Sequence, residues 1–190
     1  MAKVFVITGP SGVGKGTLIR ELLAQVPNLE LSVSATTRRP RAGEVDGRDY
    51  HFLSPEEFER RIERRDFLEF ATYSGNRYGT LRSEVERRLE EGRSVVLEIE
   101  VQGAQQVRAA KPDSVQIFIA PPDPAVLRER LVARGTDTAE AIDARLKVAA
   151  QELAAQKDFD YRIVNDDLRT AAAELVGIVR RELGEAPAGR

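Results

Sequence analysis

A glycine-rich run directly after the first apolar stretch constrains this chain more than any other feature. Val4–Thr8 has the pattern of a buried strand, and a helical pattern over Thr17–Gln25 follows the run. The run fits G-x(4)-G-K, in which glycines let successive backbone N–H groups converge on phosphate oxygens while the lysine reaches the β/γ oxygens. The sequence therefore predicts a nucleotide-phosphate site, here termed the phosphate loop, made of Gly9, Pro10, Ser11, Gly12, Val13, Gly14, Lys15, Gly16 and Thr17.

The phosphate loop departs from the full motif at one position. Gly16 stands where that motif has a serine or threonine that contacts magnesium, so Thr17 is the nearest hydroxyl. The Gly-Lys-Gly-Thr variant resembles that of adenylate kinases, where the metal is held largely through water. We expect Mg²⁺ to accompany ATP, with Thr17 as a metal contact either directly or through water. A GTPase is disfavoured because the chain has no N-K-x-D motif for guanine.

The pattern along the chain predicts an α/β fold with a mostly parallel sheet between helices, that is, a three-layer core. Helical patterns separate the strand-like runs Leu29–Ala35, Ser94–Ile99, Val115–Ile119 and Arg162–Val164. Helix starts are indicated by a Ser54-Pro55-Glu56-Glu57 capping box before Phe58–Arg65 and by Asp123-Pro124 before a helix through Arg134. A later helix is predicted over Ala139–Lys157.

Two interruptions of the alternation predict additions to one domain. Residues 36–82 carry turn signals, one helix and the strand-like Phe67–Tyr73, which indicates a small mixed α/β insertion. The stretch around Gly135–Ala139 interrupts two helices that carry arginines. We expect a domain over residues 3–183, with a core of 3–35 and 83–183, a short helical lid at about 128–145, and a flexible tail at 184–190.

Composition excludes several classes of protein. A net charge of −2 argues against a nucleic-acid binder, because such proteins usually carry a strong positive excess. No apolar run approaches the roughly 20 residues that span a bilayer, so no membrane partner is expected. The chain has no cysteine, which suits a cytoplasmic location, and no separable targeting segment is visible at its start.

Arginines gather near a proline-fixed turn at the start of the insertion, in the run Thr36-Thr37-Arg38-Arg39-Pro40-Arg41. Such a run is usually a solvated basic patch. The same insertion, however, also holds Gly43-Glu44, Tyr50, Glu69 and Asn76–Thr80.

These residues make the chain resemble the guanylate kinase family. The motifs are S-x-x-T-T-R-x-P-R-x-G-E-x-x-G-x-D-Y at Ser34–Tyr50, F-L-E at Phe67–Glu69, Y-G-T at Tyr78–Thr80 and V-N-D-D at Val164–Asp167. The resemblance covers roughly Lys3–Leu183. It implies the P-loop kinase fold and an enzyme that transfers the γ-phosphate of ATP to GMP, and to dGMP, in purine nucleotide metabolism.

The resemblance also implies residue roles. Arg38, Arg41, Tyr50 and Tyr78 would bind the GMP phosphate, while Ser34, Glu69 and Thr80 would recognise guanine together with Gly79 of the Y-G-T motif. Independent chemistry supports Glu69, because guanine presents N1–H and N2–H₂ donors to a carboxylate whereas adenine presents an unprotonated N1. Arginine forks suit a phosphate monoester because they bind two oxygens at once.

Two further acids follow a predicted strand. Glu98 and Glu100 alternate with Leu97 and Ile99 and should share one face. At the carboxyl end of a parallel strand they could organise magnesium waters or contact the acceptor, and an ordinary surface ion pair is the alternative. The family usually has Asp at the position of Glu100.

The lid supplies the remaining predicted site residues. By resemblance, Arg130, Arg134 and Arg145 close over ATP, where mobile cations meet charge on the transferring phosphoryl group. Arg128 is interpreted as ordinary helix-face charge. Asn165 and Asp166 are expected near the adenine or, alternatively, only as helix caps. His51, the one histidine, is assigned no role.

Two alternatives stay open at this stage. A related monophosphate kinase could use another acceptor, and guanylate-kinase-like domains also occur as catalytically silent protein-binding modules. The retention of Lys15, Arg134 and Arg145 favours an enzyme. The sequence leaves the oligomeric state, allosteric ligands and the choice between GMP and dGMP undetermined.

Overall fold

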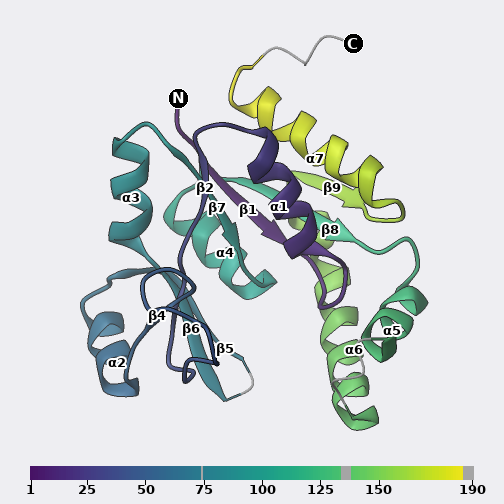
Figure 1. Ribbon diagram of the computed structural model, residues 1–190, viewed down its shortest axis with the longest axis horizontal. Helices are drawn as coiled ribbons and strands as arrows, with labels where there is room; N and C mark the ends of the chain where they lie inside the picture. The colour runs from purple at the N-terminus through teal and green to yellow at the C-terminus, as the bar shows by residue number, and fades with distance from the viewer. Residues whose placement is uncertain (74, 134–137, 186–190) are drawn as a thin grey trace. The chain divides into compact units, whose positions relative to one another are not determined.

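The computed structural model describes residues 1–73, 75–133 and 138–185. The chain forms two compact units, each of which combines segments distant in sequence (Figure 1). Unit 1 comprises Met1–Val4, Asn28–Leu97 and Gln102–Ser114, and unit 2 comprises Phe5–Pro27, Glu98–Val101 and Val115–Arg190.

Unit 2 is built on parallel strands that read as continuous apolar runs. β1 (Val4–Thr8, all but Val4 in this unit) pairs with β8 (Val115–Ala120), and β8 pairs with β9 (Tyr161–Val164). Every residue of β1 and β8 is buried, as expected of a parallel strand covered on both faces. The register sets Thr8 beside Phe118 and Ala120 beside Val164, so the carboxyl ends of these strands meet at one edge.

The helices of unit 2 follow its strands. They are α1 (Lys15–Gln25), α5 (Pro124–Ala133), α6 (Ala139–Ala154), a 3₁₀ turn at Ala155–Asp158, and α7 (Leu168–Glu182). α7 packs against α1, and Arg180 donates a hydrogen bond to the Gln25 carbonyl at 2.9 Å. The packed faces are apolar at helical spacing, with Leu18 and Leu22 buried on α1 and Leu175 and Val179 buried on α7.

Unit 1 contains a parallel strand pair and two helices that follow strands. β2 (Leu29–Leu31) pairs with β7 (Ser94–Glu98), and α3 (Arg82–Glu90) and α4 (Val101–Ala110) lie on either side of β7 in sequence. The five-stranded parallel sheet has the strand order β2-β7-β1-β8-β9, which confirms the predicted mostly parallel α/β architecture.

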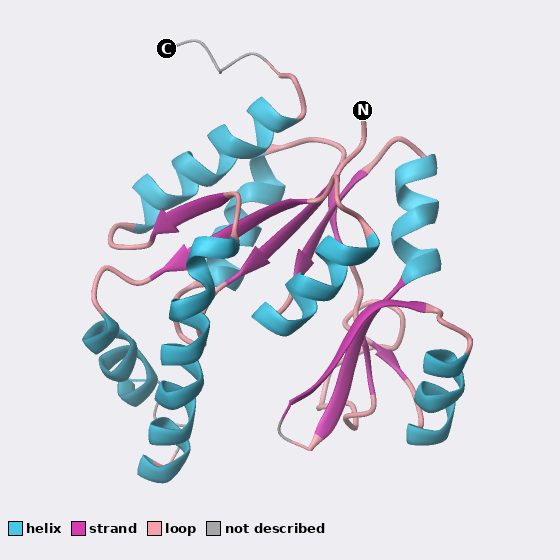
Figure 2. Ribbon diagram, turned by 180° about the vertical axis from the view of Figure 1, so that it is seen from behind, coloured by secondary structure: helices cyan, strands magenta, loops and turns pink. Residues whose placement is uncertain are grey.

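A second, mixed sheet forms the rest of unit 1, with the order β4-β3-β6-β5 (Figure 2). Its strands are β3 (Ala35–Thr36), β4 (His51–Phe52), β5 (Phe67–Tyr73) and β6 (Asn76–Leu81), and α2 (Pro55–Glu63) precedes β5. A small apolar cluster of Ala35, Phe58, Phe67 and Leu81 holds it together, and the rings of Phe58 and Phe67 stack at 4.4 Å.

The prediction of one strand over Leu29–Ala35 is wrong, because the chain changes partner within it. Ser32 N–H still donates to the Val96 carbonyl, whereas the Ser34 carbonyl already accepts from His51 N–H, so β2 and β3 belong to different sheets. The capping box at Ser54 is half formed. Ser54 Oγ accepts from Glu57 N–H at 3.1 Å, but the Glu57 carboxylate pairs with arginines of its own helix.

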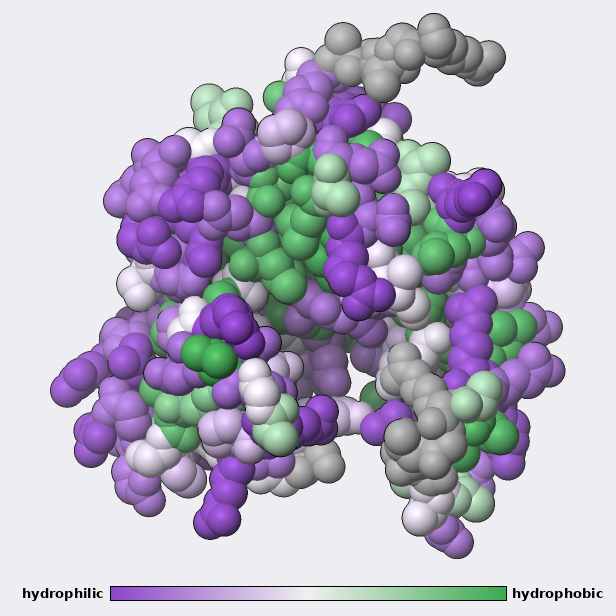
Figure 3. Space-filling view, viewed as in Figure 1, coloured by the Kyte–Doolittle hydropathy of each residue, from purple (hydrophilic) through white to green (hydrophobic). Residues whose placement is uncertain are grey.

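The proposed boundaries of core, insertion, lid and tail remain predictions. Arg134 and residues 135–137 of the lid, and residues 186–190 of the tail, lie outside the described residues. Within the described ranges, no helix combines the length and apolar character needed to cross a membrane. Hydrophilic residues cover most of the face shown in Figure 3, in keeping with a charged fraction of 32%.

Candidate functional site

The phosphate loop of unit 2 connects β1 to α1 through a tightly wound backbone. Gly14 caps α1 in a left-handed conformation with φ of 99°, which costs a glycine little. At Gly9 an added Cβ would overlap the backbone carbonyl of Ile119 on β8, so the chain can pass there only without a side chain. The glycines that the motif requires are therefore required by local geometry.

Lys15 opens α1 and folds back over its own loop. Its Nζ donates hydrogen bonds to the carbonyl oxygens of Gly9 and Pro10. A lysine ammonium has three donors and no acceptor. The side chain is thus already held over the loop whose N–H groups are expected to bind phosphate.

The carbonyl oxygen of Val13 accepts hydrogen bonds from two residues that lie much later in the sequence. Asn165, at the end of β9, donates from Nδ2 at 2.7 Å, and Arg130 of α5 donates from one guanidinium nitrogen at 3.3 Å. A second Arg130 nitrogen donates to the Asn165 carbonyl at 3.2 Å. An added Cβ at Gly14 would lie 2.6 Å from Asn165 Nδ2. Arg130 and Asn165 therefore fix the shape of the phosphate loop.

The residue that caps α7 is Asp167. Its carboxylate accepts from Thr170 N–H at 2.9 Å and from the Thr170 hydroxyl at 2.8 Å. These hydrogen bonds lower the pKa of Asp167, the backbone bond from Thr170 most. Helix capping was the alternative role considered for Asn165 and Asp166. Asn165 is instead buried against the phosphate loop, and Asp166 is exposed. The cap, Asp167, lies one residue after Asp166 and two after Asn165.

Gly16 leaves open space in the first turn of α1. No atom lies within 4 Å of the point where its Cβ would be, so a serine or threonine would fit there. Thr17 Oγ1, the predicted metal contact, accepts a hydrogen bond from Arg20 at 3.1 Å. Steric crowding therefore does not require a glycine at position 16.

Two carboxylates of unit 2 act on Lys15 electrostatically. Glu100 lies just beyond the end of β7 at Glu98, and Glu152 lies near the end of α6. Glu152 is only 8% exposed, and burial raises its pKa to about 7, while Lys15 opposes the rise and Glu100 adds to it. Desolvation likewise raises the pKa of Glu100, although its side chain is exposed, and Lys15 again opposes the rise.

The lid arginines are only partly described. Arg128 forms an exposed ion pair with Asp143 of α6 at 3.0 Å, as expected of helix-face charge. Arg145 lies half-buried on α6, and Arg134 lies outside the described residues. The structure thus places Arg130, one of the predicted lid arginines, against the phosphate loop.

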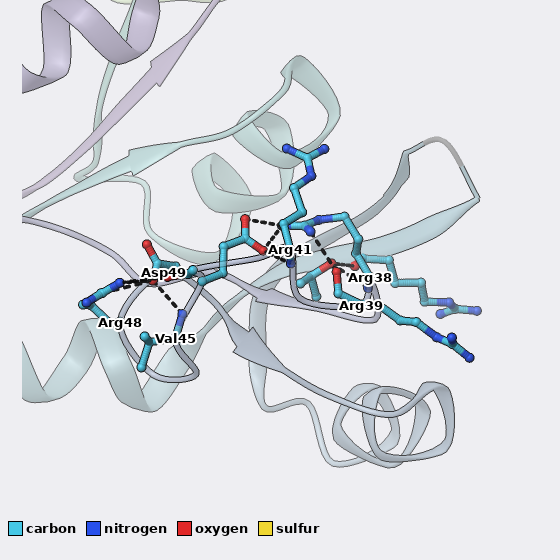
Figure 4. A network of polar contacts seen from close by, with 10 residues as sticks. Arg38, Arg39, Arg41, Val45, Arg48 and Asp49 are labelled. Atoms are coloured by element: carbon cyan, nitrogen blue, oxygen red, sulfur yellow. Dashed lines mark hydrogen bonds and ion pairs between the residues drawn. The ribbon is translucent and has the colours of Figure 1, made fainter.

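Unit 1 brings together Arg38, Tyr50 and Tyr78, three of the residues predicted for a phosphate. Figure 4 shows Arg38 and Arg41 within a network of polar contacts in this unit. The antiparallel pairing of Thr36 with Tyr78 and the parallel pairing of Thr36 with Phe52 set the Thr37–Arg41 turn beside both strands. The guanidinium of Arg38 lies 5.2 Å from the centre of the Tyr50 ring, and the Tyr50 and Tyr78 rings meet edge to face at 6.2 Å.

Glu44 organises this cluster. Its carboxylate accepts from Arg38 Nη2 at 2.8 and 3.0 Å and from the Arg41 backbone N–H at 2.7 Å. The hydrogen bond to Arg38 is the largest cause of the lowered pKa of Glu44, and its counterpart raises the pKa of Arg38. In the same loop Asp49 accepts from Val45 N–H at 2.8 Å and from Arg48, so the turn is built on carboxylate hydrogen bonds.

Glu69 and Thr80 form a buried pair in the mixed sheet. They are 4% and 1% exposed, and Thr80 Oγ1 donates to Glu69 Oε1 at 2.7 Å. Their pairing depends on an irregularity in β5. Phe67 opposes Leu81, yet Glu69 opposes Thr80, so a bulge at Leu68 shifts the register by one residue. Gly79 allows the close approach, because a Cβ there would lie 2.9 Å from the Glu69 carbonyl oxygen.

Two residues at the site carry a role that the sequence did not assign. Glu44 belongs to a motif that the sequence analysis recognised. Its position directly after Gly43 and three residues after Arg41 could have predicted its hydrogen bond to the Arg41 backbone. Glu152 had no local signal, since its proximity to Lys15 arises only from how α6 folds back. The roles predicted for Ser34, Glu98 and Asp166 rest on the sequence, with Ser34 half-buried and the two acids exposed.

Comparison with known proteins gives one consistent result. The family model described as guanylate kinase matches residues 1–182. The guanylate kinase of Rubrobacter xylanophilus is 54% identical over 94% of this chain and 94% of its own length, and that of Synechocystis sp. is 52% identical over 95% and 94%. The crystal structure of guanylate kinase from Anaplasma phagocytophilum matches with a TM-score of 0.77 and 36% identity, over 95% of this chain and 86% of that one.

The buried carboxyl of Glu152 predicts a pH-dependent stability. A carboxyl whose pKa is higher in the folded chain favours folding in its protonated form, and this contribution is lost as the pH rises through about 7. Glu152→Gln should therefore stabilise the protein at pH 8, by on the order of 1–3 kcal/mol, and by progressively less toward pH 5. Urea unfolding at both pH values measures the difference.

The exposed Glu140 on the same helix provides the control. Glu140→Gln should give the same small change at both pH values. Equal effects of the two substitutions at pH 8 would show that burial does not penalise the Glu152 carboxylate.

Proposed function

Because this chain belongs to the guanylate kinase family and is an ATP:GMP phosphotransferase, we propose that its phosphate loop binds ATP and its arginine–tyrosine cluster binds GMP. The buried Glu69–Thr80 pair carries the assignment, since a carboxylate buried in a sheet needs donors to offset the loss of water. Guanine supplies such donors at N1 and N2.

ATP binding is proposed for the backbone of Gly9–Thr17. Lys15 is hydrogen-bonded to neutral carbonyl oxygens of that loop. The β- and γ-phosphate oxygens are charged and are stronger acceptors, so ATP can take over this ammonium group. Arg130 and Asn165 keep the loop in shape from outside, and Asn165 with Asp166 would lie near the adenine.

The phosphate of GMP is proposed to bind Arg38, Arg41, Tyr50 and Tyr78. Without substrate, the Glu44 carboxylate balances the Arg38 charge and holds the Arg41 backbone. Arg38 offers five N–H donors. Glu44 engages Nη2 and the Arg39 carbonyl oxygen engages Nη1, and a phosphate would bind through the donors that these two acceptors leave. The hydroxyl groups of the two tyrosines would complete the shell.

Base recognition is proposed for Ser34, Glu69, Gly79 and Thr80. Glu69 accepts a hydrogen bond from Thr80, and a carboxylate has about four lone-pair sites in all. Its oxygens match the N1–H and N2–H₂ donors of guanine, whereas adenine would set a lone pair against the same oxygens. The same edge is present in dGMP, which we therefore propose as a second acceptor.

A divalent metal accompanies ATP in kinases, and we propose Mg²⁺. No group of three or more acidic, histidine or cysteine residues suited to a metal occurs in the described parts of the chain. Mg²⁺ fits nonetheless, because it keeps several waters and takes one or two carboxylates plus substrate phosphates. Thr17, Glu98 and Glu100 are the residues that would hold it, chiefly through water. The ion would neutralise charge on the β- and γ-phosphates.

Transfer then needs positioning and charge neutralisation more than a dedicated base. Lys15 would neutralise the charge that develops on the oxygen between the β- and γ-phosphorus atoms. This charge develops as the bond from that oxygen to the γ-phosphorus breaks. Arg145, with Arg134, would neutralise the equatorial oxygens of the transferring group. The acceptor oxygen of GMP attacks in line, and its proton has left or leaves to solvent. ADP and GDP are the products.

The biological setting is proposed as purine nucleotide metabolism in the cytoplasm, with ATP and GMP as the partners. A different monophosphate acceptor is the nearest alternative. Turnover of GMP, dGMP, AMP, dTMP and UMP in a coupled ADP-release assay tests it. We expect GMP and dGMP to be used and the others to be poor, and AMP or dTMP as the best acceptor would overturn the proposal.

Lys15→Met should fold normally and lose most turnover, because it removes a cation that acts on phosphate oxygens. The expected loss in kcat is about 10²-fold or more. Lys157→Met, at an exposed lysine, is the control and should keep full activity. Activity of the Lys15 variant within threefold of the wild type would remove Lys15 from the reaction.

Glu69→Gln should impair GMP use selectively, since half of the acceptor surface becomes an N–H₂ donor that faces the donors of guanine. The expected loss in kcat/KM for GMP is about 10–200-fold, with ATP affinity unchanged and discrimination against AMP reduced. Steady-state kinetics and ATP-analogue titration measure both. Glu63→Gln, exposed on α2, is the control. An equal loss of ATP binding would exclude Glu69 from the guanine pocket.

Arg145→Ala should lower kcat by about 10-fold or more while the KM for GMP changes little, because a lid cation meets charge that develops during transfer. Arg128→Ala removes an exposed, ion-paired arginine of the neighbouring helix and should leave both constants unchanged. If Arg145→Ala mainly raises the KM for GMP, Arg145 belongs to the acceptor site instead.

A further inference from the structure

β5 is an edge strand of the mixed sheet. In the order β4-β3-β6-β5 it pairs with β6 on one side only. An edge strand exposes main-chain N–H and C=O groups that no neighbouring strand fixes, and register is weakly specified there. β5 also contains the bulge at Leu68, directly before Glu69.

At Phe70, the side chain of Gln106 from α4 binds the exposed edge of β5 as a neighbouring strand would. Its side-chain Oε1 accepts from the Phe70 backbone N–H at 3.1 Å, and its Nε2 donates to the Phe70 carbonyl at 2.9 Å. An antiparallel ladder directs both main-chain groups of alternate residues to the same side. The amide thus reproduces, on one residue, the two hydrogen bonds that a strand would make.

The contact lies next to the residue that recognises the base. Phe70 follows Glu69, and it opposes Gly79, as Glu69 opposes Thr80. Without the bulge, continuing the Phe67–Leu81 register would set Glu69 opposite Gly79 and Leu68 opposite Thr80. Gln106 binds the backbone of Phe70, which follows the bulge, whereas Phe67 precedes it. This contact therefore favours the shifted register.

We propose that Gln106 is a positioning residue for base recognition, which holds the bulged edge strand so that Glu69 faces Thr80. This inference rests on the proposed binding of guanine by Glu69. Gln106 acts through the Phe70 backbone. Gln105, the preceding residue of α4, is exposed and serves as the matched control.

Gln106→Leu removes both hydrogen bonds at similar size. We expect the Phe70 amide to exchange with deuterium about tenfold faster or more in the free protein. We also expect kcat/KM for GMP to fall about 5- to 30-fold, mainly through KM, with the KM for ATP within twofold and weaker discrimination against AMP. Gln105→Leu should change none of these.

The outcomes separate the possible failures. Unchanged GMP kinetics in Gln106→Leu, while Glu69→Gln impairs GMP use, would overturn the positioning role and leave the proposed function intact. Equal losses for GMP and ATP would also overturn it, since they indicate a general structural effect. If Glu69→Gln itself leaves GMP kinetics unchanged, the role of Glu69 fails first.

A second variant guards against loss of folding. Gln106→Glu keeps the side-chain size and the acceptor for Phe70 N–H but sets an oxygen against the Phe70 carbonyl. Its fold is checked by thermal melting beside Gln106→Leu. A GMP-selective loss of kcat/KM supports the proposal, and wild-type GMP kinetics in this variant contradict it.

Discussion

The shape of the phosphate loop depends on the hydrogen bonds made to the carbonyl oxygen of Val13. A loop made of glycines has few side chains with which to hold its own shape. Here the shape is imposed from elsewhere, by the Asn165 amide and the Arg130 guanidinium on that single oxygen. Because Arg130 also binds the Asn165 carbonyl, the three groups form a closed set of hydrogen bonds. The sequence motif and the distant end of β9 therefore act as one structure.

Two charged residues of the candidate sites, Arg38 and Lys15, have counter-charges in their own units. Arg38 is held by Glu44, and Lys15 lies in the field of Glu100 and Glu152. Isolated buried charge is costly, and such pairing keeps both sites stable before substrate arrives. At the proposed sites, the phosphates of ATP and GMP would therefore enter surroundings whose charge is already partly balanced, so their binding would depend on geometry as well as on attraction.

Much of this could be predicted from sequence, and the remainder has a physical reason. The phosphate loop, the parallel strands and the Arg38–Tyr50–Tyr78 cluster follow from local motifs and apolar runs. The switch of partner between Ser32 and Ser34, the bulge at Leu68 and the Gln106–Phe70 contact do not, because each depends on which segments pair in three dimensions. Asp167 capped α7 where Asn165 or Asp166 was considered, since neighbouring Asx residues compete for one cap.

The open space at Gly16 has a consequence for how the loop can vary. A glycine in the middle of a helix costs roughly 0.5–1 kcal/mol relative to alanine, so Gly16 in the first turn of α1 adds no stability of its own, and no atom nearby forbids a side chain. The fold is thus indifferent to a hydroxyl at this position, or even gains from one. Replacing this glycine by serine or threonine is therefore a single substitution that folding does not oppose. Packing therefore gives no reason to keep glycine at this position, and any advantage of glycine must come from ligand chemistry.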